Sequence, residues 1–176
     1  MKTVVCLLRG VNVGGNNKID MKTLKNKLED KGLVNVKTYI NSGNIIFDSN
    51  SIELEQMIHD TIMEVFHLDI NVLILDKETF ISIASKIPLH YENNQLLKAD
   101  CMFYLKGVTK QMVDEMKNSI RVDESITLEH AFITLVSKPN YNKSKLNKII
   151  GLPIYKYLTI RNINTVIKLK NLLLER

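Results

Sequence analysis

Four short polar segments of the chain, residues 9–18, 38–44, 142–146 and 159–166, hold most of the side chains that could bind a ligand. Their polar residues are arginine, lysine, asparagine, serine, threonine, tyrosine and glycine, with no histidine, cysteine or glutamate. General acid–base catalysis usually needs histidine or a carboxylate of tuned pKa, and metal sites need clustered histidine, cysteine or carboxylates. These residue types favour binding of an anionic or carbonyl-bearing ligand over catalysis on it, and they predict no cofactor and no metal site.

The first segment, residues 9–18, follows an apolar run and precedes a helical pattern. Glycines in such a loop permit positive φ, and successive N–H groups can then face an anion. Its glycine spacing is that of a Walker A motif, but Asn16 and Asn17 stand where lysine and serine or threonine are required, so it is not a P-loop. The alternative is a surface loop in which the glycines only satisfy turn geometry. The candidate ligand-binding residues here are Arg9, Asn12, Gly14, Gly15 and Lys18.

The other three segments add further hydrogen-bond donors. A helix that begins after residue 162 would favour an anion at its start, although an asparagine there can simply cap the helix. Turn geometry alone can likewise explain the asparagine and glycine of residues 41–44. A nucleophilic pairing of Ser42 with Lys145 stays open as a further alternative. The candidate ligand-binding residues in these segments are Tyr39, Ser42, Asn44, Ser144, Lys145, Arg161, Asn162 and Asn164.

The elements that position these segments alternate between short apolar runs and helical stretches. In the first half, the pattern predicts strands over residues 3–8, 34–40, 45–48 and 70–75. It predicts one helix from an Asp20 N-cap to Gly32 and a second from Asn50 or Ser51 to about residue 66. The resulting order, β-α-β-β-α-β, is typical of the split βαβ or ferredoxin-like arrangement.

The second half resembles a looser repeat of the first. The pattern predicts a helix over about residues 77–87, then a strand at 101–105, a helix at 109–120, a hairpin at 126–137, a short helix at 144–150, a strand at 157–160 and a last helix at 163–174. We therefore expect an α+β fold of two tandem, intertwined ferredoxin-like (split βαβ) units with mainly antiparallel sheets. The first unit would span residues 1–76, a linking helix and loop residues 77–98, and the second unit residues 99–176, in one compact domain overall.

Composition and charge narrow the class of protein. With 176 residues, 45% of them hydrophobic, the chain is neither disordered nor low in complexity, and no apolar run is long enough to span a membrane. Two cysteines cannot build a disulfide framework, and the N-terminal apolar stretch lacks the features of a signal peptide, so we expect a cytoplasmic protein without a membrane partner. Residues 1–48 carry 8 basic and 4 acidic side chains, residues 49–137 carry 7 and 14, and residues 138–176 carry 9 and 1.

Three stretches together resemble the domain of unknown function 1697 family, and the resemblance runs essentially end to end. They are Leu7-Leu8-Arg9-Gly10-Val11-Asn12-Val13-Gly14-Gly15, Thr38-Tyr39-Ile40-Asn41-Ser42-Gly43-Asn44-Ile45-Ile46-Phe47 and the stretch from Thr159 to Leu169. Ser144-Lys145-Leu146 fits a fourth signature of that family. Ile163 stands where the family pattern often has tryptophan, and residues 138–142 replace a more glycine-rich approach to Ser144. The resemblance implies a bacterial cytosolic protein of two intertwined ferredoxin-like units, and it carries no assigned activity.

Three functions remain open on these observations. The first is binding of an anionic or phosphorylated small molecule at a site formed by loop 9–18, turn 41–44 and the basic segments 144–146 and 159–165. The second is a nucleic-acid-binding module, for which an isoelectric point near 9.1 is permissive, although no RNP1-like string occurs. The third is a structural or interaction protein whose polar motifs only build loops. Neither the oligomeric state nor any reaction follows from the sequence.

Overall fold

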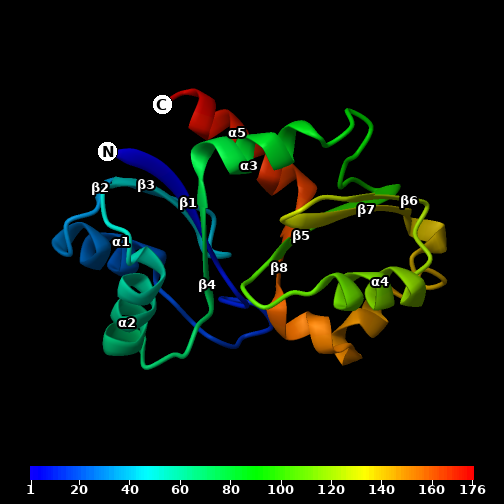
Figure 1. The fold of residues 1–176 in the computed structure, drawn as a ribbon, viewed down its shortest axis with the longest axis horizontal. Coiled ribbons are helices and arrows are strands. Elements are labelled where there is room, and N and C mark those ends of the chain that lie inside the picture. The colour runs from blue at the N-terminus through cyan, green and yellow to red at the C-terminus, as the bar shows by residue number, and fades with distance from the viewer. The chain divides into compact units, whose positions relative to one another are not determined.

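The computed structural model describes residues 1–176, which form two compact units, Met1–Ile81 and Ser82–Arg176. Each unit contains one four-stranded antiparallel sheet and helices, so the protein has an α+β fold (Figure 1). The helix α3 (Lys77–Ser85) runs across the boundary between the two units along the chain.

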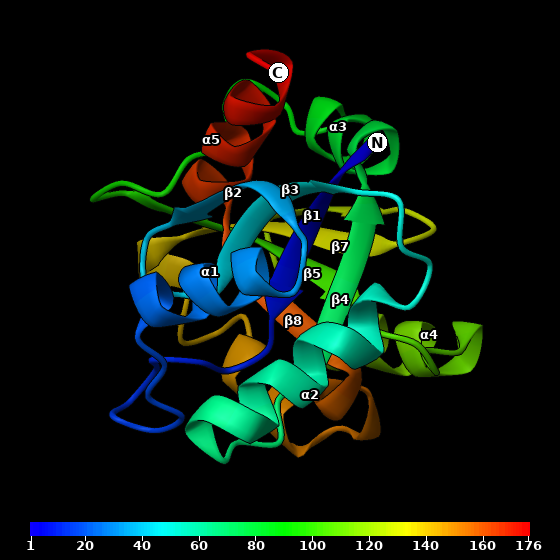
Figure 2. The ribbon, with the colours of Figure 1, turned by 90° about the vertical axis from the view of Figure 1, so that its left-hand side faces the viewer.

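The first unit follows the predicted order of elements. Its strands are β1 (Lys2–Leu8), β2 (Val34–Tyr39), β3 (Asn44–Ser49) and β4 (Val72–Asp76), and its helices are α1 (Met21–Asp30) and α2 (Leu54–Phe66). The strands pair in the order β2-β3-β1-β4. Figure 2 shows α1 and α2 side by side over one face of this sheet.

The strand β1 is apolar on both faces. All five residues from Val4 to Leu8 are buried, and Val4, Cys6 and Leu8 pack with α1 and α2 in one hydrophobic cluster. Because successive side chains of a strand point to opposite faces, Val5 and Leu7 lie on the other face. A continuous apolar run therefore marks a central strand, as the sequence indicates.

The two helices of the first unit begin differently from one another. Asp20 is the N-cap of α1 as predicted, because its carboxylate accepts a hydrogen bond of 2.7 Å from the N–H of Thr23. Hydrogen bonding from the Thr23 side chain and from its N–H lowers the pKa of Asp20, so the carboxylate stays ionised at the positive end of the helix. The prediction of Asn50 or Ser51 as the cap of α2 is wrong: the N-cap is Glu53, without a side-chain cap bond. Ser49 and Ser51 instead form a short turn in which the Ser51 N–H donates to Ser49 Oγ.

The second unit has the same strand order. Its strands are β5 (Leu97–Tyr104), β6 (Glu124–Thr127), β7 (Ala131–Ser137) and β8 (Leu158–Asn162), paired as β6-β7-β5-β8. The helix α4 (Lys110–Ser119) contributes Val113 and Met116 to a hydrophobic cluster with Met102 of β5. The last helix, α5 (Ile163–Leu174), packs against β5 and β8.

Between β7 and β8 the chain departs from regular helix. This connection contains three short 3-10 helices, η1 (Lys138–Asn140), η2 (Leu146–Gly151) and η3 (Pro153–Tyr157). Of these, η2 lies where the sequence predicts a short helix over residues 144–150, and the sequence did not predict η1 and η3. Pro139 and Pro153 lie in the first turns of η1 and η3, and each lacks the N–H that would continue a preceding helix. Leu146, Ile149 and Ile154 anchor this connection in the same cluster as α4.

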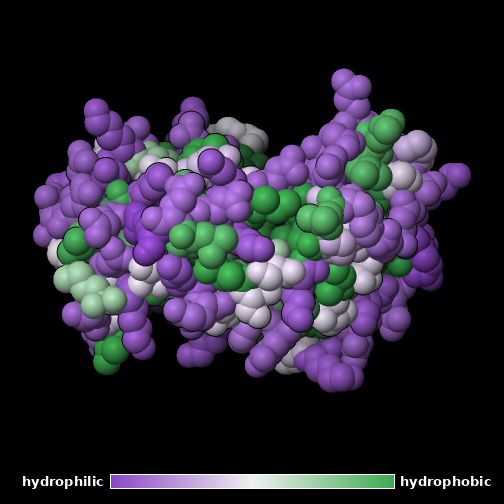
Figure 3. Space-filling view, turned by 90° about the horizontal axis from the view of Figure 1, so that it is seen from above, coloured by the Kyte–Doolittle hydropathy of each residue, from purple (hydrophilic) through white to green (hydrophobic).

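The surface is mostly polar. Figure 3 shows hydrophilic residues over most of one face, with hydrophobic residues in smaller groups between them. None of the helices combines the length and the apolar character that crossing a bilayer requires.

Gly43 fixes the turn before β3 against the end of β1. It has a φ of +74°, and its carbonyl accepts a hydrogen bond of 2.8 Å from the N–H of Leu8. A Cβ atom at this position would lie 2.6 Å from Val11 Cγ2 and 2.7 Å from Leu8 Cβ. Only glycine fits both the backbone angle and this close approach.

We expect Gly43→Ala to lower the free energy of unfolding by roughly 2–5 kcal/mol, because left-handed strain and overpacking add together. Gly14→Ala is the matched control, since Gly14 also has a positive φ (+60°) but no atom within 4 Å of an added Cβ. Gly14→Ala should lower the free energy of unfolding by only about 1–2 kcal/mol. Urea unfolding of the parent and of both variants measures these losses. Equal losses in the two variants would show that the contact with Leu8 and Val11 is unimportant.

Candidate functional site

Loop 9–18 folds into a small hairpin of its own. The Asn12 N–H donates to the Asn17 carbonyl and the Asn16 N–H to the Val13 carbonyl, both over 3.1 Å. Gly14 and Gly15 occupy the two central positions of the tip with φ values of +60° and +80°, as a type I′ turn requires. Both glycines are exposed, and neither makes a hydrogen bond within the protein.

Asn12 ties this loop to the neighbouring turn. Its Nδ2 donates to the carbonyls of Ile19, over 2.9 Å, and Asn41, over 2.7 Å. Its Oδ1 accepts from the Ile19 N–H over 2.9 Å. All three bonds use the side-chain amide, so Asn12 organises the loop and has little hydrogen-bonding capacity left for a ligand.

The second polar segment, residues 38–44, contains a turn at residues 40–43. Asn44 is fully buried, and its Nδ2 donates to the Tyr39 carbonyl over 3.1 Å and to Ser42 Oγ over 2.9 Å. Ile40 has a φ of +48°, which is rare for a β-branched residue, and its side chain is half exposed. The first unit thus brings loop 9–18 and turn 40–43 together through Asn12, while Asn44 holds the turn from inside.

The cationic residues of loop 9–18 are placed differently. Lys18 is exposed and has no carboxylate partner. Arg9 is half-buried, and its N–H donates to the Asn71 carbonyl over 3.0 Å at the end of the connection between α2 and β4. Lys18, the Asn16 side-chain amide and the two glycine N–H groups are therefore donors that the loop presents to solvent.

Ser144 and Lys145 lie in the connection between β7 and β8. Ser144 is fully buried, and its hydroxyl donates to the Tyr141 carbonyl over 2.5 Å and accepts from the Leu146 N–H over 3.3 Å. Lys145 has a φ of +60° at the N-cap of η2, and its side chain is exposed. The serine therefore shapes the turn, while the lysine faces solvent.

In the segment of residues 159–166, at the start of α5, the polar side chains form hydrogen bonds with other residues of the second unit. Arg161 is 5% exposed, and its guanidinium donates to Thr159 Oγ1 over 3.0 Å and to the Ile160 carbonyl over 2.9 Å. Asn162 is the N-cap of α5, accepting from the Asn164 N–H, as the capping alternative predicts. Asn164 in turn binds both backbone groups of Asn93, at 3.2 and 3.0 Å, and so fastens the preceding loop to the helix.

The predicted set therefore divides into residues that build loops and residues that face solvent. Those with side chains engaged in the fold are Asn12, Ser42, Asn44, Ser144, Arg161, Asn162 and Asn164. Lys18 and Lys145 are exposed, as are the backbones of Gly14 and Gly15, and the remaining two residues, Arg9 and Tyr39, are half-buried. A ligand role for each of the thirteen residues stays a prediction.

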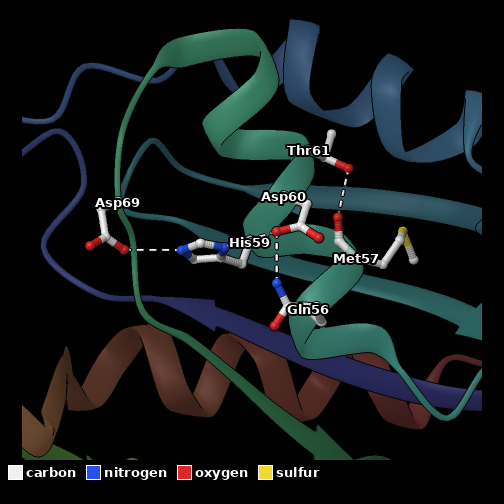
Figure 4. A network of polar contacts seen from close by, with 6 residues as sticks. All are labelled: Gln56, Met57, His59, Asp60, Thr61 and Asp69. Carbon is white, nitrogen blue, oxygen red and sulfur yellow. Dashed lines mark hydrogen bonds and ion pairs between the residues drawn. The ribbon is translucent and has the colours of Figure 1, made fainter.

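A polar network that the sequence did not single out lies at α2. Figure 4 shows His59 between two carboxylates: Nε2 is 3.0 Å from Asp69 Oδ1, and Nδ1 is 3.2 Å from Asp60 Oδ1. Gln56 also donates to Asp60 over 2.7 Å. The hydrogen bonds to Asp69 and Asp60 raise the pKa of His59, and the bond to His59 lowers the pKa of Asp60. The sequence signal for this network is the spacing of its residues. Gln56 and Asp60 are four residues apart on α2, and Asp69 follows His59 by ten residues, just beyond the end of the helix.

Other titratable groups lie outside the four polar segments in the sequence. His90 Nε2 is 3.0 Å from Glu124 Oε2, and burial raises the pKa of the neighbouring Tyr91 to about 12. Cys6 and Cys101 are buried free thiols, and burial raises the pKa of Cys101. No three histidine, cysteine or carboxylate side chains are grouped closely enough to hold a metal ion.

The fold and its loops define the class of the protein: it is an α+β protein whose hydrogen-bond donors are gathered in loops beside antiparallel strands. The family model described as "Protein of unknown function (DUF1697)" matches residues 1–133, and the chain belongs to this family. The chain is also similar to the solved structure of conserved bacterial protein SP0830 from Streptococcus pneumoniae, with 29% sequence identity, a TM-score of 0.78 and coverage of 98% of each chain. No curated protein matches the sequence.

We expect Asn12→Asp to destabilise the first unit by about 2–4 kcal/mol. The substitution replaces the donor that lies 2.7 Å from the Asn41 carbonyl with an ionised acceptor, so two carbonyls then face negative charge. Urea unfolding measures the loss globally, and faster amide hydrogen exchange at Asn12 and Asn16, whose N–H groups close the hairpin of loop 9–18, should report it locally. Asn16→Asp is the control, because that exposed side chain makes no hydrogen bond; equal effects of the two variants would contradict the role of Asn12.

We expect His59 to make stability depend on pH. Because folding raises its pKa, its contribution is fully present below about pH 6.5, the ordinary value, and is lost as the pH rises through the folded value. His59 and its two carboxylate partners are partly or fully exposed, so their interaction contributes at most about 1 kcal/mol to the free energy of unfolding. The difference in stability between parent and His59→Gln should therefore shrink from pH 5.5 to pH 8.5, with His130→Gln as the control. A difference that is constant over this range would contradict the assignment.

Proposed function

We propose that the protein binds an anionic or phosphorylated small molecule, and that the first unit supplies its principal contacts from loop 9–18. The observation that carries this proposal is the fixed hairpin tip, whose two glycine N–H groups are unpaired and exposed. Backbone N–H groups in a positive-φ turn are a common means of holding phosphate oxygens. Lys18, which no carboxylate neutralises, adds a charged donor three residues further along the chain.

The rigidity of this tip supports binding. Asn12 fastens the loop at Ile19 and Asn41, and Asn17 Nδ2 donates to the Gly10 carbonyl over 3.0 Å. Donors that are already held in place lose little conformational entropy when a ligand binds. The nearest carboxylate along the chain, Asp20, is engaged with the Thr23 N–H and has a lowered pKa, so it is a poor general base at neutral pH. Binding without chemistry is therefore the function that these residues support best.

We further infer that the two units are tandem ferredoxin-like repeats of a cytoplasmic protein. The same order of strands in the two sheets, with a helix after the first strand of each unit, supports the repeat. Two free thiols are typical of a reducing compartment.

We expect inorganic phosphate to shift the amide resonances of Gly14 and Gly15 in a saturable manner in a ¹H–¹⁵N titration, with sugar phosphates and nucleoside monophosphates compared next. Lys18→Gln should weaken the tightest of these ligands roughly tenfold, since a charge-assisted hydrogen bond contributes about 1.5–3 kcal/mol.

Lys37→Gln is the matched control, because Lys37 is an exposed lysine of β2 in the same unit and without a carboxylate partner. It should leave the affinity unchanged. Absence of saturable shifts at both glycines, or equal weakening by the two substitutions, would reject the proposal.

A further inference from the structure

The connection from Lys138 to Tyr157, which contains η1, η2 and η3, has an unbalanced charge. It carries five lysines, at positions 138, 143, 145, 148 and 156, and no aspartate or glutamate. All five side chains are exposed, and none of them forms an ion pair with a carboxylate. We call this connection the basic strip.

Three lysines of the first unit, by contrast, are paired with carboxylates. In the first unit, Lys25 lies 3.7 Å from Glu29, Lys27 lies 3.9 Å from Asp30, and Lys31 lies 3.3 Å from Glu64. The topologically equivalent connection between β3 and β4, residues 50–71, has five acidic residues and no lysine or arginine. The connection between β7 and β8 is therefore basic where its counterpart in the first unit is acidic.

The backbone brings one more cation to the strip. The Arg121 N–H donates to the Ser144 carbonyl over 2.7 Å, so Arg121 lies beside Lys143 and Lys145. Its guanidinium donates to the carbonyls of Asn118 and Ile120 at the end of α4 and has no carboxylate partner. Buried Ser144 and Leu146 hold this part of the strip in place.

The strip also contains aromatic rings. Tyr141, Tyr155 and Tyr157 are each half-buried. Lys98 Nζ lies 5.7 Å from the centroid of the Tyr141 ring, and Lys156 Nζ lies 4.9 Å from that of Tyr157. A surface that combines lysines with aromatic rings is suited to a single strand of nucleic acid, because the cations bind the phosphates and the rings stack on bases.

We propose that the basic strip, with Arg121, binds single-stranded nucleic acid. Helices of three, six and five residues offer no long helix or two-stranded ribbon to enter the major groove of a duplex. Ile150 is the one large hydrophobic side chain exposed in the strip, which is too little apolar surface to anchor a membrane. This inference concerns a different surface from loop 9–18 and does not rest on the proposed function.

The test is fluorescence anisotropy of the full chain with a labelled 20-nucleotide oligouridylate at several salt concentrations between 50 and 200 mM. The plot of log K against log[salt] should be linear with a negative slope. Because each phosphate contact on a single strand contributes about 0.7 to that slope, the triple variant Lys143→Gln, Lys145→Gln, Lys148→Gln should reduce its magnitude by about 2.

The matched control removes the same net charge from α1, as Lys22→Gln, Lys25→Gln, Lys27→Gln. It should keep the parent slope, because these residues lie in the first unit and two of them are already paired with carboxylates. Equal loss of slope in both triple variants would mean that net charge alone drives binding, and would overturn the proposal.

Stacking is tested separately at Tyr141. Tyr141→Leu keeps an apolar side chain in the hydrophobic cluster but should weaken binding at least fivefold, whereas Tyr141→Phe should bind like the parent. Circular dichroism of both variants checks their folding. No binding at 50 mM salt, tighter binding to duplex than to single strand, or preferential binding to vesicles of anionic lipid would each overturn the proposal.

Discussion

The constraint that organises the first unit is a central strand whose buried side chains are all apolar. In the first unit β1 pairs antiparallel with β3 on one edge and with β4 on the other, and the side chains from Val4 to Leu8 are all buried. Polar side chains must therefore gather where the strand ends. Because both neighbours run antiparallel, the end of β1 lies beside the starts of β3 and β4. Hydrogen bonds from Leu8 to Gly43 and from Arg9 to Asn71 join the three connections there.

This geometry explains which features could be predicted from the sequence. Apolar runs and caps such as Asp20 are local signals, and they predicted the order of elements with small differences at the ends. The roles of single polar residues depend on partners that are distant in sequence: Asn12 binds Asn41, and Asn164 binds Asn93 across 71 residues. The sequence therefore identifies a segment that is rich in hydrogen-bond donors. It does not reveal whether each donor binds another part of the fold or faces solvent.

The two units use one strand order with opposite charges in equivalent connections. Residues 50–71, between β3 and β4, form the acidic helix α2, in which His59 is held by Asp60 and Asp69. Residues 138–157, between β7 and β8, form three short 3-10 helices that carry only positive charge. Since neither connection contributes a strand, each can change in length, helix type and charge without altering the sheet. The difference in charge between these two connections therefore leaves the shared strand order intact.

The two surfaces differ in how they could discriminate between anions. At the tip of loop 9–18 the donors are backbone N–H groups held by Asn12 and Asn17, so their directions are fixed and suit one small ligand of matching shape. On the basic strip the donors are lysine side chains with many rotamers, which follow the density of charge and not the arrangement of particular oxygens. The first arrangement suits a phosphate monoester, and the second suits a chain of phosphodiesters. One strand order is therefore compatible with two different arrangements of donors, because the positions that distinguish them lie outside the paired strands.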